Sequence, residues 1–230
     1  MPRVAIAYEE LVTQLERGEI DLAWLPPIAF LRLKDQVRTL VVNQRQAYRC
    51  IVAVRASGRY AKLDDLRGAR AAWVDPYSTT GYVLPLLDLV AKGVDVHTAF
   101  GEQRFFGSHD AAARAVFEGR SDLVGTFAEY DGERLVRSGL SAVGSGTDWR
   151  VLLRGSESPS DVLVARTSLD VEVCAALKSA LSRAFDDEAT ARLVRDALHV
   201  EAFGEADDAR YGALADTIAR AHREGLLSHL

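Results

Sequence analysis

The sequence has few cysteines and no long apolar run. Only two of its 230 residues are cysteine, and no cysteine or histidine spacing matches a zinc site, so no metal centre is expected. No uninterrupted apolar stretch approaches the roughly 20 residues that span a bilayer, so no membrane span is expected. The chain also lacks a P-loop and a paired nucleophile and base, and its motifs therefore predict neither a cofactor nor a catalytic reaction.

An excess of basic charge is also absent. The chain has 33 acidic and 28 basic residues, a net charge of -5 and a pI near 5.6. A nucleic-acid partner is therefore not expected, because such surfaces carry a clustered basic face. With 48% hydrophobic and 27% charged residues, the composition is ordinary for a globular chain, which at this length forms one large domain or two small lobes.

The most informative segment is residues 75–81, Asp-Pro-Tyr-Ser-Thr-Thr-Gly. An apolar run before it predicts a strand over 69–74, and the pattern after it predicts a helix over 79–91. The first N–H groups of a helix lack intrahelical partners and carry the positive end of the dipole. Hydroxyls beside them can therefore bind an oxyanion without lysine or arginine. Ser78 or Thr79 could instead only cap the helix, and the local pattern leaves both interpretations open.

The order of the predicted elements indicates an α/β fold of two lobes. Polar stretches at 55–60 and 155–160 bracket the middle third of the chain, which predicts a lobe over 57–156 inserted into a lobe made of 1–56 and 157–230. A cleft between such lobes is a preferred ligand site and closes by hinge motion. The predicted strands include 3–7, 20–25, 37–42, 48–54, 94–100, 121–126, 149–153 and 162–165, and the predicted helices include 9–17, 28–33, 109–118, 128–137, 170–185, 187–198 and 208–225.

An ordered set of segments resembles one known family. The set comprises Ala7-Tyr8 and residues 18–26, 48–52, 64–68, 75–85, 107–110 and 118–122. It resembles the phosphate/phosphite/phosphonate-binding proteins of ABC transporters, the PhnD-like branch of the periplasmic binding proteins. The resemblance covers most of residues 5–165, and its most specific part is residues 78–81 together with Ser108-His109-Asp110.

The resemblance implies a type II periplasmic-binding-protein fold, in which two α/β lobes close on one ligand. It also implies that hydroxyl, aromatic and histidine side chains hold the oxyanion. The matching positions are Ser78, Thr79, Thr80, Tyr8, Tyr48 and His109. Asp161 falls near a family position that can meet an amino group of an aminophosphonate, and Glu129 falls near a second acidic position in a loosely aligned segment.

Family members usually begin with an export or lipoprotein signal, and then a strand and a helix before the segment that matches residues 4–8. This sequence shows neither, so we expect the first strand and helix of the fold to be missing and an edge of lobe one to be exposed. The expected location is periplasmic or extracytoplasmic if an N-terminal segment is missing, and cytoplasmic if the chain starts as written.

Three functions fit this scaffold. The leading prediction is a monomeric solute-binding protein that captures a phosphonate, phosphite or phosphate for an ABC transporter and delivers it to the permease. The alternatives are a cytosolic enzyme with His109 as acid or base, and a sensor module that signals to a partner protein when it closes. The fold alone does not decide among them.

Overall fold

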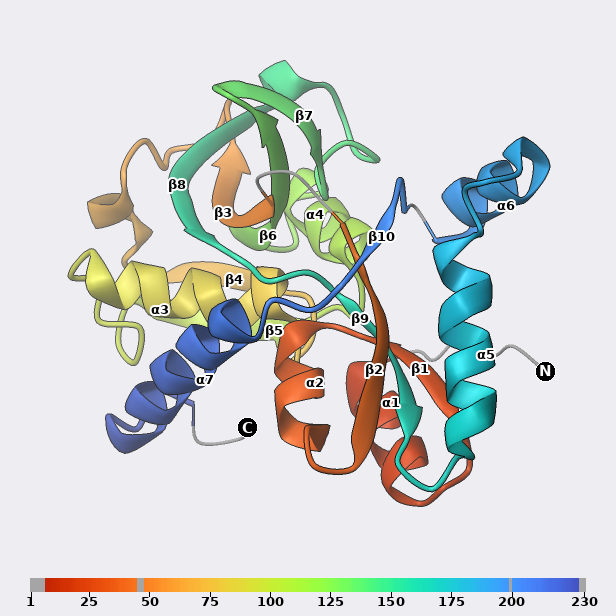
Figure 1. Cartoon of the computed structure of the whole chain (residues 1–230). Helices are drawn as coiled ribbons and strands as arrows, with labels where there is room; N and C mark the ends of the chain where they lie inside the picture. The colour runs from red at the N-terminus through yellow and green to blue at the C-terminus, as the bar shows by residue number, and fades with distance from the viewer. Residues whose placement is uncertain (1–6, 45–47, 199, 228–230) are drawn as a thin grey trace. The chain divides into compact units, whose positions relative to one another are not determined.

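The computed structural model describes residues 7–44, 48–198 and 200–227, which divide into two compact units (Figure 1). Unit 1 comprises Met1–Arg45 and Pro159–Thr217, and unit 2 comprises Gln46–Ser158 and Ile218–Leu230. This division differs from the predicted one, which assigned residues 1–56 to lobe one. Residues 48–55 instead form a strand of the sheet in unit 2, because they pair there with strands on both sides.

Unit 1 is built on a four-stranded antiparallel sheet of order β1-β9-β2-β10. Its strands are β1 (Leu22–Leu25), β2 (Val37–Asn43), β9 (Val162–Arg166) and β10 (Phe203–Gly204). Its helices are α1 (Tyr8–Glu16), α2 (Pro27–Leu33), α5 (Val171–Ser182), α6 (Glu188–Leu198) and the first part of α7 (Asp208–Arg223). Leu40 of β2, Ala165 of β9 and Cys174 of α5 form one buried cluster, so α5 covers a face of this sheet.

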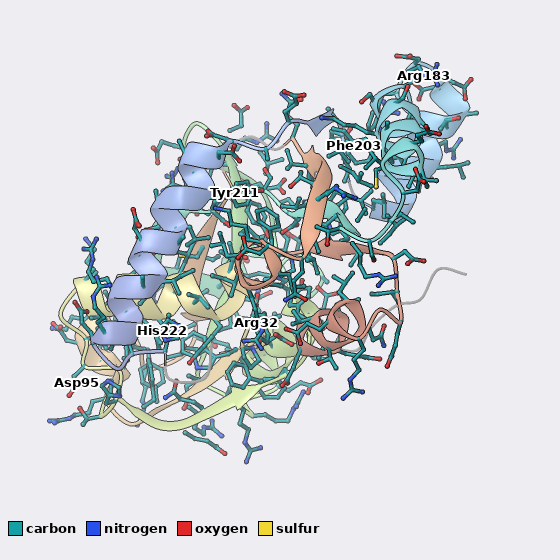
Figure 2. The ribbon with its side chains drawn as sticks, turned by 60° about the horizontal axis from the view of Figure 1, so that its bottom comes forward. Arg32, Asp95, Arg183, Phe203, Tyr211 and His222 are labelled. Atoms are coloured by element: carbon teal, nitrogen blue, oxygen red, sulfur yellow. The ribbon has the colours of Figure 1, made fainter. Side chains whose placement is uncertain are left out.

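Two aromatic side chains labelled in Figure 2 add to the packing of unit 1. Phe203 lies between Trp24 and Phe185, with ring centroids 6.2 Å and 5.4 Å away, and so connects β10 to β1 and to the loop after α5. Tyr211 meets Phe30 edge-on at 5.1 Å and thereby holds the start of α7 against α2. Pairs in such tilted and edge-on geometries add stabilisation beyond their buried area.

Unit 2 contains a six-stranded mixed sheet. Its strands are β3 (Tyr48–Arg55), β4 (Ala69–Trp73), β5 (Phe100–Phe105), β6 (Leu123–Asp131), β7 (Arg134–Ser138) and β8 (Trp149–Glu157), and its helices α3 (Leu84–Ala91) and α4 (His109–Phe117) flank the sheet. The strand order is β5-β4-β6-β3-β8, with β7 paired to β6. Strand β4 runs parallel to β5 and β6, and β6 runs antiparallel to β3.

Two sequence-based predictions in unit 2 are wrong. The helix predicted over 128–137 is instead the hairpin of β6 and β7, which turns at Gly132-Glu133 with Gly132 at φ 56. Gly132 supplies the positive φ that the first position of such a tight hairpin turn needs, and this signal outweighs the helical pattern. The strand predicted over 94–100 is absent because Asp95 accepts hydrogen bonds from His97 N and Thr98 Oγ1 and forms a turn there; the strand begins at Phe100.

Asp88 ties helix α3 to the sheet of unit 2. Its carboxylate accepts hydrogen bonds from Cys50 Sγ at 3.1 Å and from the Ser156 backbone N and Oγ, both at 2.6 Å. Burial, together with the nearby Asp88 charge, raises the pKa of the Cys50 thiol well above its usual value, so the thiol stays protonated and acts as a donor. Both cysteines are free and buried, as the sequence predicted.

The predicted strand over residues 3–7 lies, except for Ala7, outside the described residues. Within the described ranges, none of the helices combines the length and the apolar character that a membrane crossing requires. In the same ranges, no group of His, Cys, Asp and Glu side chains is arranged to hold a metal ion.

Candidate anion-binding site

The candidate site begins where β4 ends, in a buried turn. Asp75 is 3% exposed and its Oδ1 accepts a hydrogen bond from Tyr77 N at 2.8 Å, while its backbone oxygen accepts one from Ser78 N at 2.9 Å. The first bond forms an Asx-turn and the second is the bond of a β-turn, and aspartate favours both arrangements at chain reversals. The turn therefore places Ser78, Thr79 and Thr80 directly at the start of the next helix.

That helix starts as a π-helix, η2 (Thr79–Val83), which continues into α3. Pro85 explains the wide turn: it has no N–H, and its ring excludes the carbonyl of the residue four positions earlier, Gly81. The Gly81 carbonyl accepts instead from Val74 N at 3.2 Å, and Val83 N donates to Ser78 O at 3.1 Å, a five-residue spacing. Single π-turns of this kind are frequent at functional sites.

The three hydroxyl side chains are almost completely buried. Ser78, Thr79 and Thr80 are 2%, 3% and 3% exposed. Ser78 Oγ accepts from Gly81 N at 3.1 Å, so the capping role that the sequence allowed is confirmed. Capping does not exclude ligand binding, because a hydroxyl that accepts one hydrogen bond still has a proton to donate.

Tyr48 approaches the hydroxyl turn from another segment, and His109 is connected to Tyr48 through Phe127. Tyr48 Oη lies 3.4 Å from Thr80 Oγ1. The Tyr48 ring stacks on Phe127 with centroids 5.3 Å apart, and the His109 ring meets Phe127 edge-on at 4.9 Å. Phe127 of β6 therefore connects the start of β3 to the start of α4, and residues predicted from three separate segments come together in unit 2.

His109 is held in place by a buried threonine. His109 Nδ1 lies 2.7 Å from Thr126 Oγ1, and Thr126 is 0% exposed. Gly139 packs closely over this pair: a Cβ added there would overlap Thr126 Oγ1 and lie 3.0 Å from His109 Cβ. Sequence reasoning did not assign roles to Thr126, Phe127 or Gly139. Extending the predicted strand beyond residue 126 would have placed Phe127 in it, but its position beside Tyr48 follows from the register of β3 and β6, and no sequence signal marked Gly139.

Glu129 lies opposite Tyr48 in the pairing of β3 with β6. Its Oε1 accepts from Arg137 Nη2 at 2.6 Å, and the Arg137 guanidinium lies 5.3 Å from the centroid of the Phe127 ring. The arginine thus compensates the carboxylate charge at the edge of the site. This strand position differs from the predicted helix and results from the β6–β7 hairpin.

The other two predicted residues lie in unit 1. Tyr8 is the first residue of α1 and is half-buried. Asp161 directly precedes β9, and its backbone oxygen accepts from Asn43 N at 3.0 Å. Six of the eight predicted residues therefore share unit 2, and these two belong to the other unit.

Comparison with known proteins gives one family and several solved structures. The model of the family described as "ABC transporter, phosphonate, periplasmic substrate-binding protein" matches residues 2–211. A binding protein component of an ABC phosphonate transporter from Pseudomonas aeruginosa is 20% identical, with a TM-score of 0.79 over 95% of this chain and 74% of its own. PhnD1 from Prochlorococcus marinus in complex with methylphosphonate is 17% identical, with a TM-score of 0.76 over 98% and 85%. A Xanthomonas citri protein bound to ATP is 22% identical, with a TM-score of 0.75 over 95% and 85%.

Proposed function

The chain belongs to the family of periplasmic substrate-binding proteins of phosphonate ABC transporters and has their type II fold, and on this premise we propose that it captures a small phosphorus oxyanion for an ABC permease. The ligand is a phosphonate, phosphite or phosphate. Because the family is extracytoplasmic, the capture takes place outside the cytoplasm. The chain binds its ligand as a monomer and does not convert it.

The observation that carries this proposal is the convergence of neutral donors in unit 2. Ser78, Thr79 and Thr80 are buried at a helix start, and Tyr48 Oη lies within reach of Thr80 Oγ1. Hydrogen bonds to a charged acceptor are stronger than those to a neutral one, and a desolvated site strengthens them further. Several hydroxyl donors therefore suit the oxygens of a tetrahedral oxyanion without a full positive charge.

The acidic residues bear on whether the ligand carries an amino group. Glu129 is already paired with Arg137, so an ammonium group would gain little additional interaction with it. The amine-facing role of Asp161 stays a prediction, because this residue lies in unit 1. We therefore expect ligands without an amino group to bind at least as well as 2-aminoethylphosphonate.

Calorimetric titration of the chain tests the proposal. Phosphate, phosphite, methylphosphonate and 2-aminoethylphosphonate are the ligands, and methanesulfonate is the control, since it matches the shape of methylphosphonate with less charge. We expect micromolar or tighter binding of at least one phosphorus ligand and weaker binding of methanesulfonate. Absence of heat with all four phosphorus ligands would contradict the proposal. ³¹P NMR of the recovered ligand separates binding from catalysis, because a converted ligand would support the enzymatic alternative.

Thr126 acts as a positioning residue for His109. Replacing Thr126 by valine keeps the shape but removes the hydrogen bond to His109 Nδ1, so we expect phosphonate binding to weaken by about tenfold. Thr126→Ser retains the hydroxyl and should bind nearly as the wild type does. Calorimetric titration of both variants, at a temperature at which both are fully folded, checks this prediction. Equal loss in the two variants would assign Thr126 a packing role only.

A further inference from the structure

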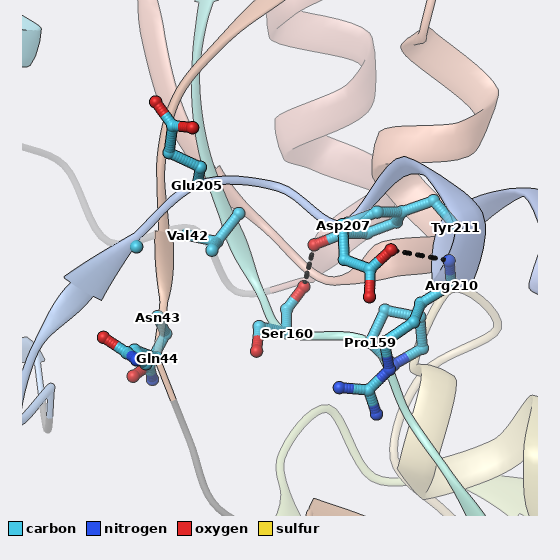
Figure 3. Close-up of a pocket in the computed structure, with 10 residues that line it drawn as sticks. Val42, Asn43, Gln44, Pro159, Ser160, Glu205, Asp207, Arg210 and Tyr211 are labelled. Atoms are coloured by element: carbon cyan, nitrogen blue, oxygen red, sulfur yellow. Dashed lines mark hydrogen bonds between the residues drawn. The ribbon is translucent and has the colours of Figure 1, made fainter.

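Unit 1 contains a cavity of about 190 Å³ between the end of β2, the segment before β9 and the start of α7 (Figure 3). Polar groups of its lining already have partners. Glu205 Oε1 accepts from Lys178 Nζ at 3.4 Å, and Tyr211 Oη donates to Ser160 O at 2.6 Å, as a dashed line in Figure 3 shows. These bonds join the walls of the cavity, so the groups that make them stabilise the fold of unit 1.

A second cavity lies in unit 2, away from the hydroxyl turn. Its volume is about 180 Å³, and it is enclosed by the end of β3, the loop after β3, the end of α4 and the segment before β6. Arg55, the last residue of β3, lines this cavity, whereas Tyr48, the first residue of β3, lies at the hydroxyl turn. At about 3.3 Å per residue, the length of β3 places these two residues roughly 20 Å apart. The cavity is therefore separate from the candidate oxyanion site.

Two buried hydroxyl groups line this cavity, and each has a proton to donate. Ser121 is 3% exposed, and no group of the described residues forms a hydrogen bond with its hydroxyl. Tyr60 is 5% exposed; its Oη accepts from Arg59 Nη2 at 2.7 Å, and none of the described groups accepts its proton. Buried polar groups in folded proteins are almost always satisfied. An acceptor that enters the cavity would therefore gain hydrogen bonds from both hydroxyls.

Two arginines add positive charge to the same lining. Arg55 Nη1 donates to Phe117 O at 3.1 Å, and Arg59 Nη2 donates to Tyr60 Oη. Within the part of the chain that the structure describes, each guanidinium thus bonds a neutral oxygen and neither pairs with a carboxylate. A guanidinium has five N–H groups, so both can still donate to a ligand. Both side chains are exposed and can turn toward a ligand without disturbing the core.

The carboxylate in this lining, Asp122, is already neutralised by Arg70. Arg70 Nε and Nη2 donate to Asp122 Oδ2 and Oδ1 at 3.0 Å and 2.9 Å. These side-chain hydrogen bonds lower the pKa of Asp122, so the carboxylate stays charged and paired. Asp148, which is near enough to Arg55 for the two charges to interact, lies outside the lining and accepts from Ser145 N and Oγ. The lining therefore keeps an excess of two positive charges.

We propose that this cavity binds a small oxyanion with two negative charges, of the size of sulfate or a short dicarboxylate. Its oxygens accept from Ser121 Oγ and Tyr60 Oη, and the guanidinium groups of Arg55 and Arg59 compensate its charge. A monoanion would leave one arginine without a counter-charge. At about 30 Å³ for each water molecule, the cavity holds roughly six waters, which is enough for such an ion but not for a nucleotide. The site lies wholly in unit 2 and does not depend on the hydroxyl turn.

The test uses the full chain at low ionic strength, where salt screens the charges of exposed groups least. Sulfate and malonate carry two negative charges, whereas methanesulfonate and acetate each carry one. Calorimetry and thermal shift are recorded up to millimolar concentrations for the wild type, Ser121→Ala and Arg55→Gln/Arg59→Gln. Arg134→Gln is the matched control, because Arg134 is an exposed arginine of β7 in unit 2 and does not line the cavity.

We expect both dianions to bind the wild type and Arg134→Gln, and each monoanion to bind about tenfold or more weakly. Ser121→Ala and Arg55→Gln/Arg59→Gln should each weaken dianion binding by about tenfold or more. The melting temperature of Ser121→Ala without ligand should stay at or above that of the wild type, because the substitution removes an unsatisfied buried hydroxyl. Arg59→Gln alone keeps the Arg55 bond to the end of α4 and should show the same loss in smaller measure, which separates binding from folding.

Sulfate binding should persist in Ser78→Ala/Thr79→Ala, which separates this site from the oxyanion site. The proposal is overturned if neither dianion binds, if the monoanions bind as tightly, or if Ser121→Ala and the double arginine variant bind like the wild type. It is also overturned if Arg134→Gln loses as much affinity, because the effect would then reflect net charge alone, or if Ser78→Ala/Thr79→Ala no longer binds sulfate.

Discussion

Replacing Ser78 and Thr79 together by alanine is expected to weaken phosphonate binding by about a hundredfold or more. Each hydroxyl can donate one hydrogen bond to a charged oxygen, and such a bond contributes about 1.5–3 kcal/mol, so losing two corresponds to roughly 10²–10⁴-fold. The loss of affinity should fall near the upper end of this range. Both side chains are almost completely buried, so bulk solvent cannot supply hydrogen-bond donors in place of the lost hydroxyls. Calorimetric titration with the best phosphorus ligand measures the change.

Folding must be separated from binding in this variant. Ser78→Ala also removes the acceptor for Gly81 N, and the loss of such a helix cap costs about 1 kcal/mol. Thr79→Ala alone keeps that cap and should still lose much of the binding. Ser182→Ala/Thr217→Ala is the matched control, because these two exposed hydroxyls only bond helix carbonyls in unit 1. If the Ser78 and Thr79 variant bound as tightly as the wild type, the hydroxyl turn would be a cap and nothing more.

Gly81→Ala is expected to destabilise unit 2 by about 3 kcal/mol, a cost typical of overpacking in a closed site. The added Cβ would overlap the Val74 side chain and lie 2.6 Å from Ser78 Oγ. These neighbours cannot retreat easily, since Val74 N donates to the Gly81 carbonyl and Ser78 Oγ accepts from Gly81 N. Urea unfolding followed by tryptophan fluorescence, to which the buried Trp73 and Trp149 of unit 2 contribute, measures the change.

Gly212→Ala is the matched control: it is the same substitution, but it is expected to raise the stability of the chain. Gly212 lies within α7, and a Cβ added there meets nothing within 4 Å. Because alanine favours the helix over glycine, this variant should gain about 0.5–1 kcal/mol. A Gly81→Ala variant with unchanged stability would mean that β4 and η2 do not pack as closely as described.

Local sequence signals predicted much of the secondary structure. The apolar periodicity of α1 and α4 and the Ser108 cap on α4 were recognisable, and Ser108 Oγ accepts from Ala111 N at 3.2 Å. Predictions failed where turns competed with periodicity, at Asp95 and at Gly132. In each place one residue decides the path of the chain, Asp95 through its side-chain hydrogen bonds and Gly132 through its positive φ, and a pattern averaged over ten residues does not register it.

The sequence by itself determined the hydroxyl turn, because every cause of that turn is local. Asp75 bonds to backbone groups two and three positions away, and Pro85 frees the carbonyl of Gly81 four positions earlier. Only the tertiary structure decided what surrounds it. Tyr48 and His109 meet at Phe127 through strand register and helix packing. Such contacts depend on which strands pair and in which register, and no short stretch of sequence specifies that choice.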